Sequence, residues 1–158
     1  RSYYIMANIN HSNLTDPYLH EPKGVATATA NKVYVASGSG SGSWQDHRRS
    51  VFTVHFTDIS TAQSFYLPIP FAGTVSRITS VIAAAMGGSD VVVTVKNSSA
   101  ATMGTLTITQ AGSAAGDVDS LNPSSNNTPT DNDYILLETD GGATGHVDFV
   151  ISVVVEHT

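Results

Sequence analysis

Alternation of apolar and polar residues predicts β-strands over most of the second half of the chain. The clearest runs are residues 75–85, which are rich in β-branched side chains, and residues 91–95, which read Val-Val-Val-Thr-Val. We interpret them as a central hairpin joined at Gly87-Gly88, with the core beginning in the segment from Phe65 to Pro70 that precedes them. A β-sandwich core is therefore predicted to start in this region.

Shorter runs repeat this pattern on both sides of the predicted hairpin. Strands are predicted at residues 50–57, 104–109, 133–139 and 146–156, where the last run points Val147, Phe149, Ile151, Val153 and Val155 inward. Asp140-Gly141-Gly142 is a hairpin turn signal, and residues 111–130 are predicted to be a long exposed loop carrying surface contacts. Seven or eight short, evenly spaced strands predict an all-β fold, an antiparallel β-sandwich of jelly-roll type.

The first part of the chain lacks this alternation. Residues 6–24 show no periodicity and contain Pro17 and Pro22, so they are predicted to form an extended arm whose spaced apolar groups are buried against another protein. The alternative is an ordinary ordered loop folded back on the sandwich. Residues 25–32 fit a helical turn or an extended strip equally, and residues 32–36 are predicted as a short strand.

A Gly/Ser run at residues 37–43 predicts a flexible linker, which ends at Trp44. The only tryptophan of the chain beside such a linker suggests an anchor for the arm, although a tryptophan in the core or rim of the sandwich fits as well. The predicted domains are residues 1–49, comprising the arm and linker, and residues 50–158, the sandwich. Met6-Ala7-Asn8 has the form of a natural start, so we expect residues 1–5 either to be foreign to the native chain or to come from an upstream start site, and we set them aside.

Composition narrows the classes of function. Only 13% of the 158 residues are charged, which predicts little helix, and the net charge of −6 gives no electrostatic basis for binding nucleic acid or an anionic membrane. The chain has no cysteine, so disulfides and thiolate metal sites are excluded. No apolar run is long enough to span a bilayer.

No stretch of the sequence carries a recognisable reactive centre. A G-x-S-x-G motif is missing, and the glycines of residues 38–42 lack the Lys and Ser/Thr of a phosphate-binding loop. The six histidines show no i, i+2 or i, i+4 spacing for a shared metal, and the carboxylates at residues 117–119 and 131–133 lack the full ligand series of a calcium loop. We therefore predict no catalytic residue, no metal, no cofactor and no enzymatic activity.

Three motifs near the N-terminus carry a resemblance to a known family. They are residues 16–26 (DPYLHEPKGVA), residues 32–36 (KVYVA) and residues 39–44 (SGSGSW), and together they resemble a recurrent N-terminal module of tailed-bacteriophage virion proteins. After Ser50, residues 65–73 (FYLPIPFAG), 115–118 (AGDV) and 133–135 (DYI) resemble the sandwich domain of phage capsid decoration, or cement, proteins. The resemblance covers nearly the whole chain from Asn8.

This resemblance implies a non-enzymatic structural protein on the outer surface of a virion capsid. The expected partner is the major capsid protein, whose neighbouring subunits the arm would clamp while the sandwich projects outward, and the expected state is a homotrimer, which would add avidity. The resemblance and the residue chemistry together place capsid contacts at the following arm residues: Asp16, Pro17, Tyr18, His20, Glu21, Pro22, Lys23 and Gly24.

Two other functions remain open at this stage. Sandwich domains often bind glycans, so a receptor- or glycan-binding module of a head fibre or tail, with host-surface glycan as its partner, is the main alternative. The loop at residues 111–130 could then be the recognition surface, although it contains no aromatic residue. A tail or head-fibre component that shares the N-terminal module is the second alternative.

Overall fold

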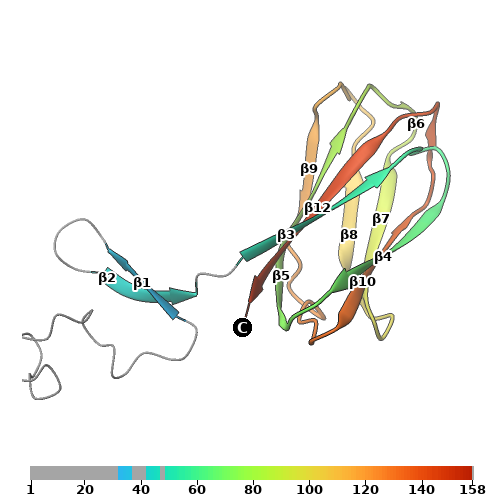
Figure 1. Ribbon diagram of the computed structural model, residues 1–158. Coiled ribbons are helices and arrows are strands. Elements are labelled where there is room, and N and C mark those ends of the chain that lie inside the picture. The colour runs from blue at the N-terminus through green and yellow to red at the C-terminus, as the bar shows by residue number, and fades with distance from the viewer. Residues whose placement is uncertain (1–31, 37–41, 47–48, 158) are drawn as a thin grey trace, which may run out of the picture. The chain divides into compact units, whose positions relative to one another are not determined.

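The computed structural model describes residues 32–36, 42–46 and 49–157, and the chain divides into two compact units, residues 1–47 and 48–158 (Figure 1). In the first unit, β1 (Lys32–Ala36) and β2 (Gly42–Asp46) form an antiparallel two-stranded sheet. The described residues contain no helix and therefore no candidate membrane-spanning helix.

The second unit is a sandwich of two four-stranded antiparallel sheets, ordered β3-β12-β5-β9 and β4-β10-β7-β8 (Figure 1). The short strands β6 and β11 pair with each other. The strands of this unit are β3 (Arg49–Phe56), β4 (Gln63–Ile69), β5 (Gly73–Ile82), β6 (Gly87–Gly88), β7 (Val91–Asn97), β8 (Thr102–Ile108), β9 (Val118–Leu121), β10 (Asp133–Thr139), β11 (Ala143–Thr144) and β12 (Phe149–His157).

The path of the chain between these sheets is that of a jelly roll. Every connection between successive long strands crosses from one sheet to the other, except the hairpin that joins β7 to β8. The all-β antiparallel sandwich of jelly-roll type predicted from the sequence is confirmed.

Alternating side chains fill the space between the two sheets. The inward residues of β12 and β7 are fully buried, as are Ile78, Ile108, Ile135 and Leu137 from strands of both sheets. In β5 the inward residues Val75 and Ile78 are three apart because a β-bulge interrupts the pairing with β12 between Val154 and Val155. Pro68 lies in β4, an edge strand, where proline's missing N–H leaves no gap in the sheet's interior.

Two predicted connections are wrong. The runs at residues 75–85 and 91–95 do not form a hairpin, because β5 and β7 belong to different sheets and Gly87-Gly88 forms β6 instead of a turn. Likewise, Asp140-Gly141-Gly142 does not close a hairpin, because β10 and β12 lie in opposite sheets. Alternation reports which side chains face inward and carries no information on which strands pair.

The stretch predicted as an uninterrupted loop contains a strand. Residues 118–121 form β9, which pairs with β5 through Val81↔Val118 and Ile78↔Leu121 at the edge of its sheet. Leu121 packs against the core, and Val118 is exposed. The linker prediction also extends too far, since Gly42 and Ser43 belong to β2.

Candidate functional site

The described part of the first unit is a hairpin with an aromatic pair on one face. Tyr34 of β1 and Trp44 of β2 are directly opposite each other, with ring centroids 5.4 Å apart in an edge-to-face arrangement. A β-carbon on Gly42 would lie 2.7 Å from the Tyr34 ring, so the glycine makes room for the tyrosine. Val33 and Val35 are exposed at 41% and 38%.

The residues predicted to contact the capsid, Asp16 to Gly24, lie outside the described residues. Trp44, predicted as the arm anchor at the end of a linker, lies in the middle of β2. Its role as an anchor stays a prediction. What the geometry adds is that Tyr34 holds Trp44 in place across the hairpin.

At one end of the sandwich, four ionisable side chains form a chain of alternating acids and histidines. His146 lies between Asp58, at 3.6 Å, and Asp148, at 3.5 Å, and Asp148 continues to His55 at 3.3 Å. The imidazoles of His146 and His55 are 71% and 54% exposed, so these contacts are screened by water and add little stability. They link the β3–β4 loop to the segment before β12.

Hydrogen bonding keeps Asp58, at one end of this series of acids and histidines, negatively charged. The Ser60 hydroxyl and backbone N–H both donate to Asp58, at 2.6 and 2.9 Å, and the Thr61 hydroxyl donates at 2.9 Å. These bonds, led by the Ser60 hydroxyl, lower the pKa of Asp58 to about 2, and His146 adds a smaller contribution. Asp58 therefore stays ionised at neutral pH.

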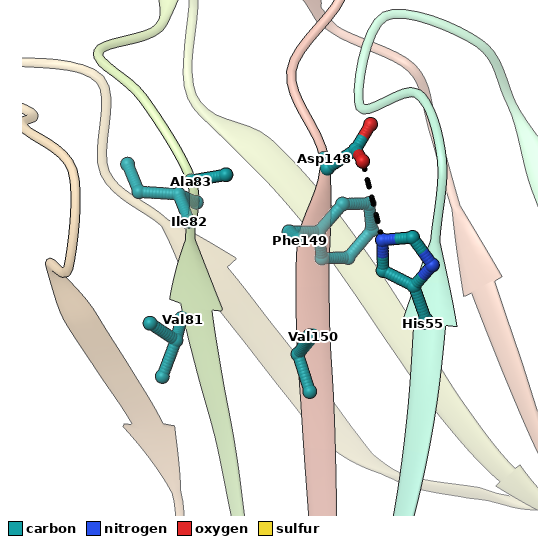
Figure 2. A pocket seen from close by; sticks show the side chains of 7 residues that line it. All are labelled: His55, Val81, Ile82, Ala83, Asp148, Phe149 and Val150. Carbon is teal, nitrogen blue, oxygen red and sulfur yellow. Dashed lines mark ion pairs between the residues drawn. The ribbon is translucent and has the colours of Figure 1, made fainter.

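A shallow pocket of about 220 Å³ adjoins this chain on the outer face of one sheet (Figure 2). His55, Val81 and Val150 lie on three neighbouring strands, and the His55–Asp148 pair forms one rim (Figure 2). The pocket is also lined by Ile82, Ala83 and Phe149. It is smaller than most small-molecule sites and nearly all apolar, so it can accept an aliphatic side chain and offers little to a polar substrate.

The histidines described in the sandwich are not arranged as the base of a hydrolase triad, which would contact both a hydroxyl nucleophile and an acid. Within residues 49–157, neither His55 nor His146 has a hydrogen bond to a hydroxyl group that could act as a nucleophile. A hydrogen bond of 2.9 Å joins Ser50 to His157, but within those residues no acid contacts His157. Its ring stacks on Phe71 with centroids 3.6 Å apart, which indicates that the pair closes the end of the core.

An aromatic surface lies on the outer face of the other sheet. Tyr66 is 60% exposed, and its ring contacts that of Tyr134 edge-on with centroids 5.3 Å apart. The Tyr134 hydroxyl donates to the Ser98 carbonyl at 3.2 Å, and Pro68 is opposite Tyr134 in the neighbouring strand. This surface was not predicted from the sequence, because aromatic residues for glycan binding were expected only in the loop at residues 111–130, which has none.

The aromatic hairpin, the acid–histidine series with its pocket, and the Tyr66–Tyr134 surface differ in what they can bind. In the described part of the chain, no group of three or more His, Cys, Asp or Glu side chains is arranged to hold a metal ion. The aromatic hairpin and the Tyr66–Tyr134 surface can both bind by stacking and apolar contact, and both hold their rings in fixed positions. The described residues therefore offer two aromatic surfaces that are suited to binding.

Comparisons with known proteins give a fold likeness and nothing closer. No protein-family model and no curated protein matches the chain. Several solved structures resemble it. One is the carbohydrate-binding module CsCBM6-3 of Clostridium stercorarium in complex with cellobiose, at 14% identity over 82% of this chain and 85% of that one, with a TM-score of 0.41. Another is the capsid asymmetric unit of cyanophage Pam1, at 15% identity over 97% of this chain and 100% of that one, with a TM-score of 0.48. A third is an endospore appendage of Bacillus, from a family of disulfide-linked pili, at 13% identity over 83% of this chain and 96% of that one, with a TM-score of 0.38. At these scores the likeness carries no argument about function.

Proposed function

We propose that this chain is a non-enzymatic structural protein of a phage virion. It binds the outer surface of the capsid through its N-terminal unit and cements neighbouring subunits of the major capsid protein, while the sandwich projects outward. In this role it acts as a homotrimer, and three N-terminal units bound together give an avidity that one cannot.

The observation that carries this proposal is the contrast between the two units. The sandwich has a complete hydrophobic core of its own, built from both of its sheets. The described part of the N-terminal unit is a two-stranded hairpin, a size that is marginally stable alone in water, and it exposes Val33 and Val35. A hairpin of this size gains stability by binding a surface, and the resemblance of the N-terminal sequence to a virion module implies that this surface is the capsid.

The test is binding of the full-length protein to capsids of the source phage from which it has been removed. We expect Trp44→Ala to weaken co-sedimentation with these capsids about tenfold or more, because a buried aromatic anchor contributes about 2 kcal/mol or more to an interface. Tyr66→Ala on the sandwich is the matched control and should bind as the unchanged protein does. The proposal is refuted if the Trp44 variant, and a chain that lacks residues 6–43, both bind these capsids as strongly as the unchanged protein does.

A second function is favoured by the Tyr66–Tyr134 surface. The exposed Tyr66 ring, which contacts Tyr134 on the same sheet face as the Lys96–Glu138 ion pair, offers a stacking face and polar partners to a sugar. The protein would then bind host-surface glycan as part of a head fibre or tail. Binding to a glycan array that disappears in Tyr66→Ala and survives in Trp44→Ala would favour this function, and the reverse pattern would exclude it.

A further inference from the structure

The outer face of the β3-β12-β5-β9 sheet exposes more aliphatic surface than any other described part of the sandwich. Val51, Val81 and Val118 are exposed at 62%, 40% and 58%, and the half-buried Val150 and Val154 lie between them. Figure 2 shows Val81 and Val150 side by side on neighbouring strands. Exposed aliphatic groups gathered on one face mark an interaction surface more often than scattered ones do.

The side chains at the centre of this face form three bands that run across the strands, and a fourth row beyond them carries the Arg49–Glu156 ion pair. The strand registers place His55, Val150, Val81 and Val118 in one band, Thr53, Ser152, Thr79 and Ser120 in the next, and Val51, Val154 and Arg77 in the third. A band of hydroxyl groups therefore lies between two bands that are mostly valine. Arg77 is the only charged residue in the three bands, apart from His55, which is paired with Asp148.

This banding is self-complementary. A two-fold axis along the hydroxyl band, in the plane between two facing sheets, sets each hydroxyl band against its counterpart and each valine band against the other valine band. Hydroxyl groups both donate and accept hydrogen bonds, so two identical bands can satisfy one another. The same axis brings the exposed Val51 of one copy over the strand that carries His55 in the other, at the rim of the apolar pocket.

The net negative charge opposes self-association, but its distribution makes this face less repulsive than the loops. Residues 49–157 contain ten acidic side chains, eight Asp and two Glu, against two Arg and one Lys, which gives this part of the chain a net charge of −7. Most of these acids are in loops, namely Asp58, Asp90, Asp117, Asp131, Asp140 and Asp148. Two copies repel each other wherever these loops meet, whereas the three bands bring no carboxylate against another.

We propose that this face is a self-association surface, on which the occupant is a second copy of the same chain. Four strands about 4.8 Å apart and three bands about 7 Å apart give a face of roughly 400 Å², about half the area that a standard interface buries on each partner. Self-association is therefore weak and depends on concentration. The inference does not depend on the proposed role at the capsid.

Sedimentation equilibrium of the full-length protein, from about 10 μM to about 1 mM, tests this inference. The unchanged protein should show a reversible rise in average mass with concentration. Thr79→Asp, in the centre of the hydroxyl band, should weaken association about tenfold or more, because it sets like charges opposite each other. Thr105→Asp is the matched control, since Thr105 is exposed on β8 in the other sheet, and it should associate as the unchanged protein does.

A second variant separates loss of association from loss of folding. Val118→Asp is on the edge strand β9, at a position already 58% exposed, so it should fold and still weaken association. Circular dichroism checks the fold of all three variants. The homotrimer proposed above would also raise the average mass, so the comparison of variants decides which contact is responsible. The inference is overturned if the average mass of the unchanged protein does not rise with concentration, or if the Thr79 and Val118 variants associate as strongly as the Thr105 variant. Capsid binding by the N-terminal unit is measured separately, so either proposal can fail alone.

Discussion

Substitution of Gly141 should reveal how tightly the turn after β10 is packed against the β3–β4 loop. Gly141 has a φ of +71°, and a β-carbon there would lie 2.5 Å from the backbone nitrogen of Ala62 and 2.7 Å from the carbonyl carbon of Thr61. Both neighbours are backbone atoms, so no side-chain rotation can relieve the contact. Gly112 has a similar φ of +78° with nothing within 4 Å of its β-carbon position, and is the matched control.

The two substitutions separate backbone strain from steric overlap. In Gly112→Ala, a left-handed alanine costs roughly 1–2 kcal/mol, offset by about 0.4–1 kcal/mol from the reduced freedom of the unfolded chain. Gly141→Ala carries the same two contributions and adds an overpacking cost of about 1–3 kcal/mol. We therefore expect the free energy of unfolding to fall by about 1 kcal/mol in the control and by about 2–4 kcal/mol in Gly141→Ala.

Urea unfolding followed by far-UV circular dichroism measures the difference. The fluorescence of Trp44 is the wrong probe, because the only tryptophan lies in β2, outside the sandwich. With a typical urea dependence, the midpoint of Gly141→Ala should lie about 1 M below that of Gly112→Ala. Equal midpoints for the two variants would show that the turn and the loop move apart at no cost, and would refute this account of the packing.

Three further predictions concern the core and Asp58 in the β3–β4 loop. Phe149→Ala should lower the free energy of unfolding by about 3–5 kcal/mol in chemical denaturation, because the ring is fully buried and stacked on Phe56; a loss below about 1 kcal/mol would contradict it. Ser80→Ala should leave thermal stability unchanged or raise it, because within the described residues the buried hydroxyl has no hydrogen-bond partner, and a clear drop would reveal a partner. The pKa of Asp58 is lowered from 3.8 to about 2, so the contribution of this carboxylate to stability is complete above pH 3.8 and is lost as the pH falls toward 2. Ser60→Ala should raise this pKa in a carboxyl NMR titration, because it removes the hydroxyl that contributes most to the shift; an unchanged pKa would contradict that cause.

Part of the candidate site could be predicted from the sequence and part could not. Trp44 was recognised as an anchor candidate because a single tryptophan beside a Gly/Ser run is conspicuous, but its pairing with Tyr34 depends on the register of a hairpin. The acid–histidine chain joins Asp58 to His146, which are far apart in sequence, so spacing rules for metal or catalytic pairs could not find it. The β9 strand was missed because four residues with two polar side chains give too short an alternation.

The sequence by itself determined the all-β class and the buried face of strands with a clear alternation, such as β12, because side chains alternate with a period of two wherever one face of a sheet is buried. Phe149, Ile151, Val153 and Val155 are fully buried as their alternation predicts. Only the tertiary structure decided which strands share a sheet, because jelly-roll connections cross between sheets and successive strands are mostly not partners. The same long-range pairing sets Val51, Val81 and Val118 on one face, since each belongs to a different strand and only the sheet brings them together.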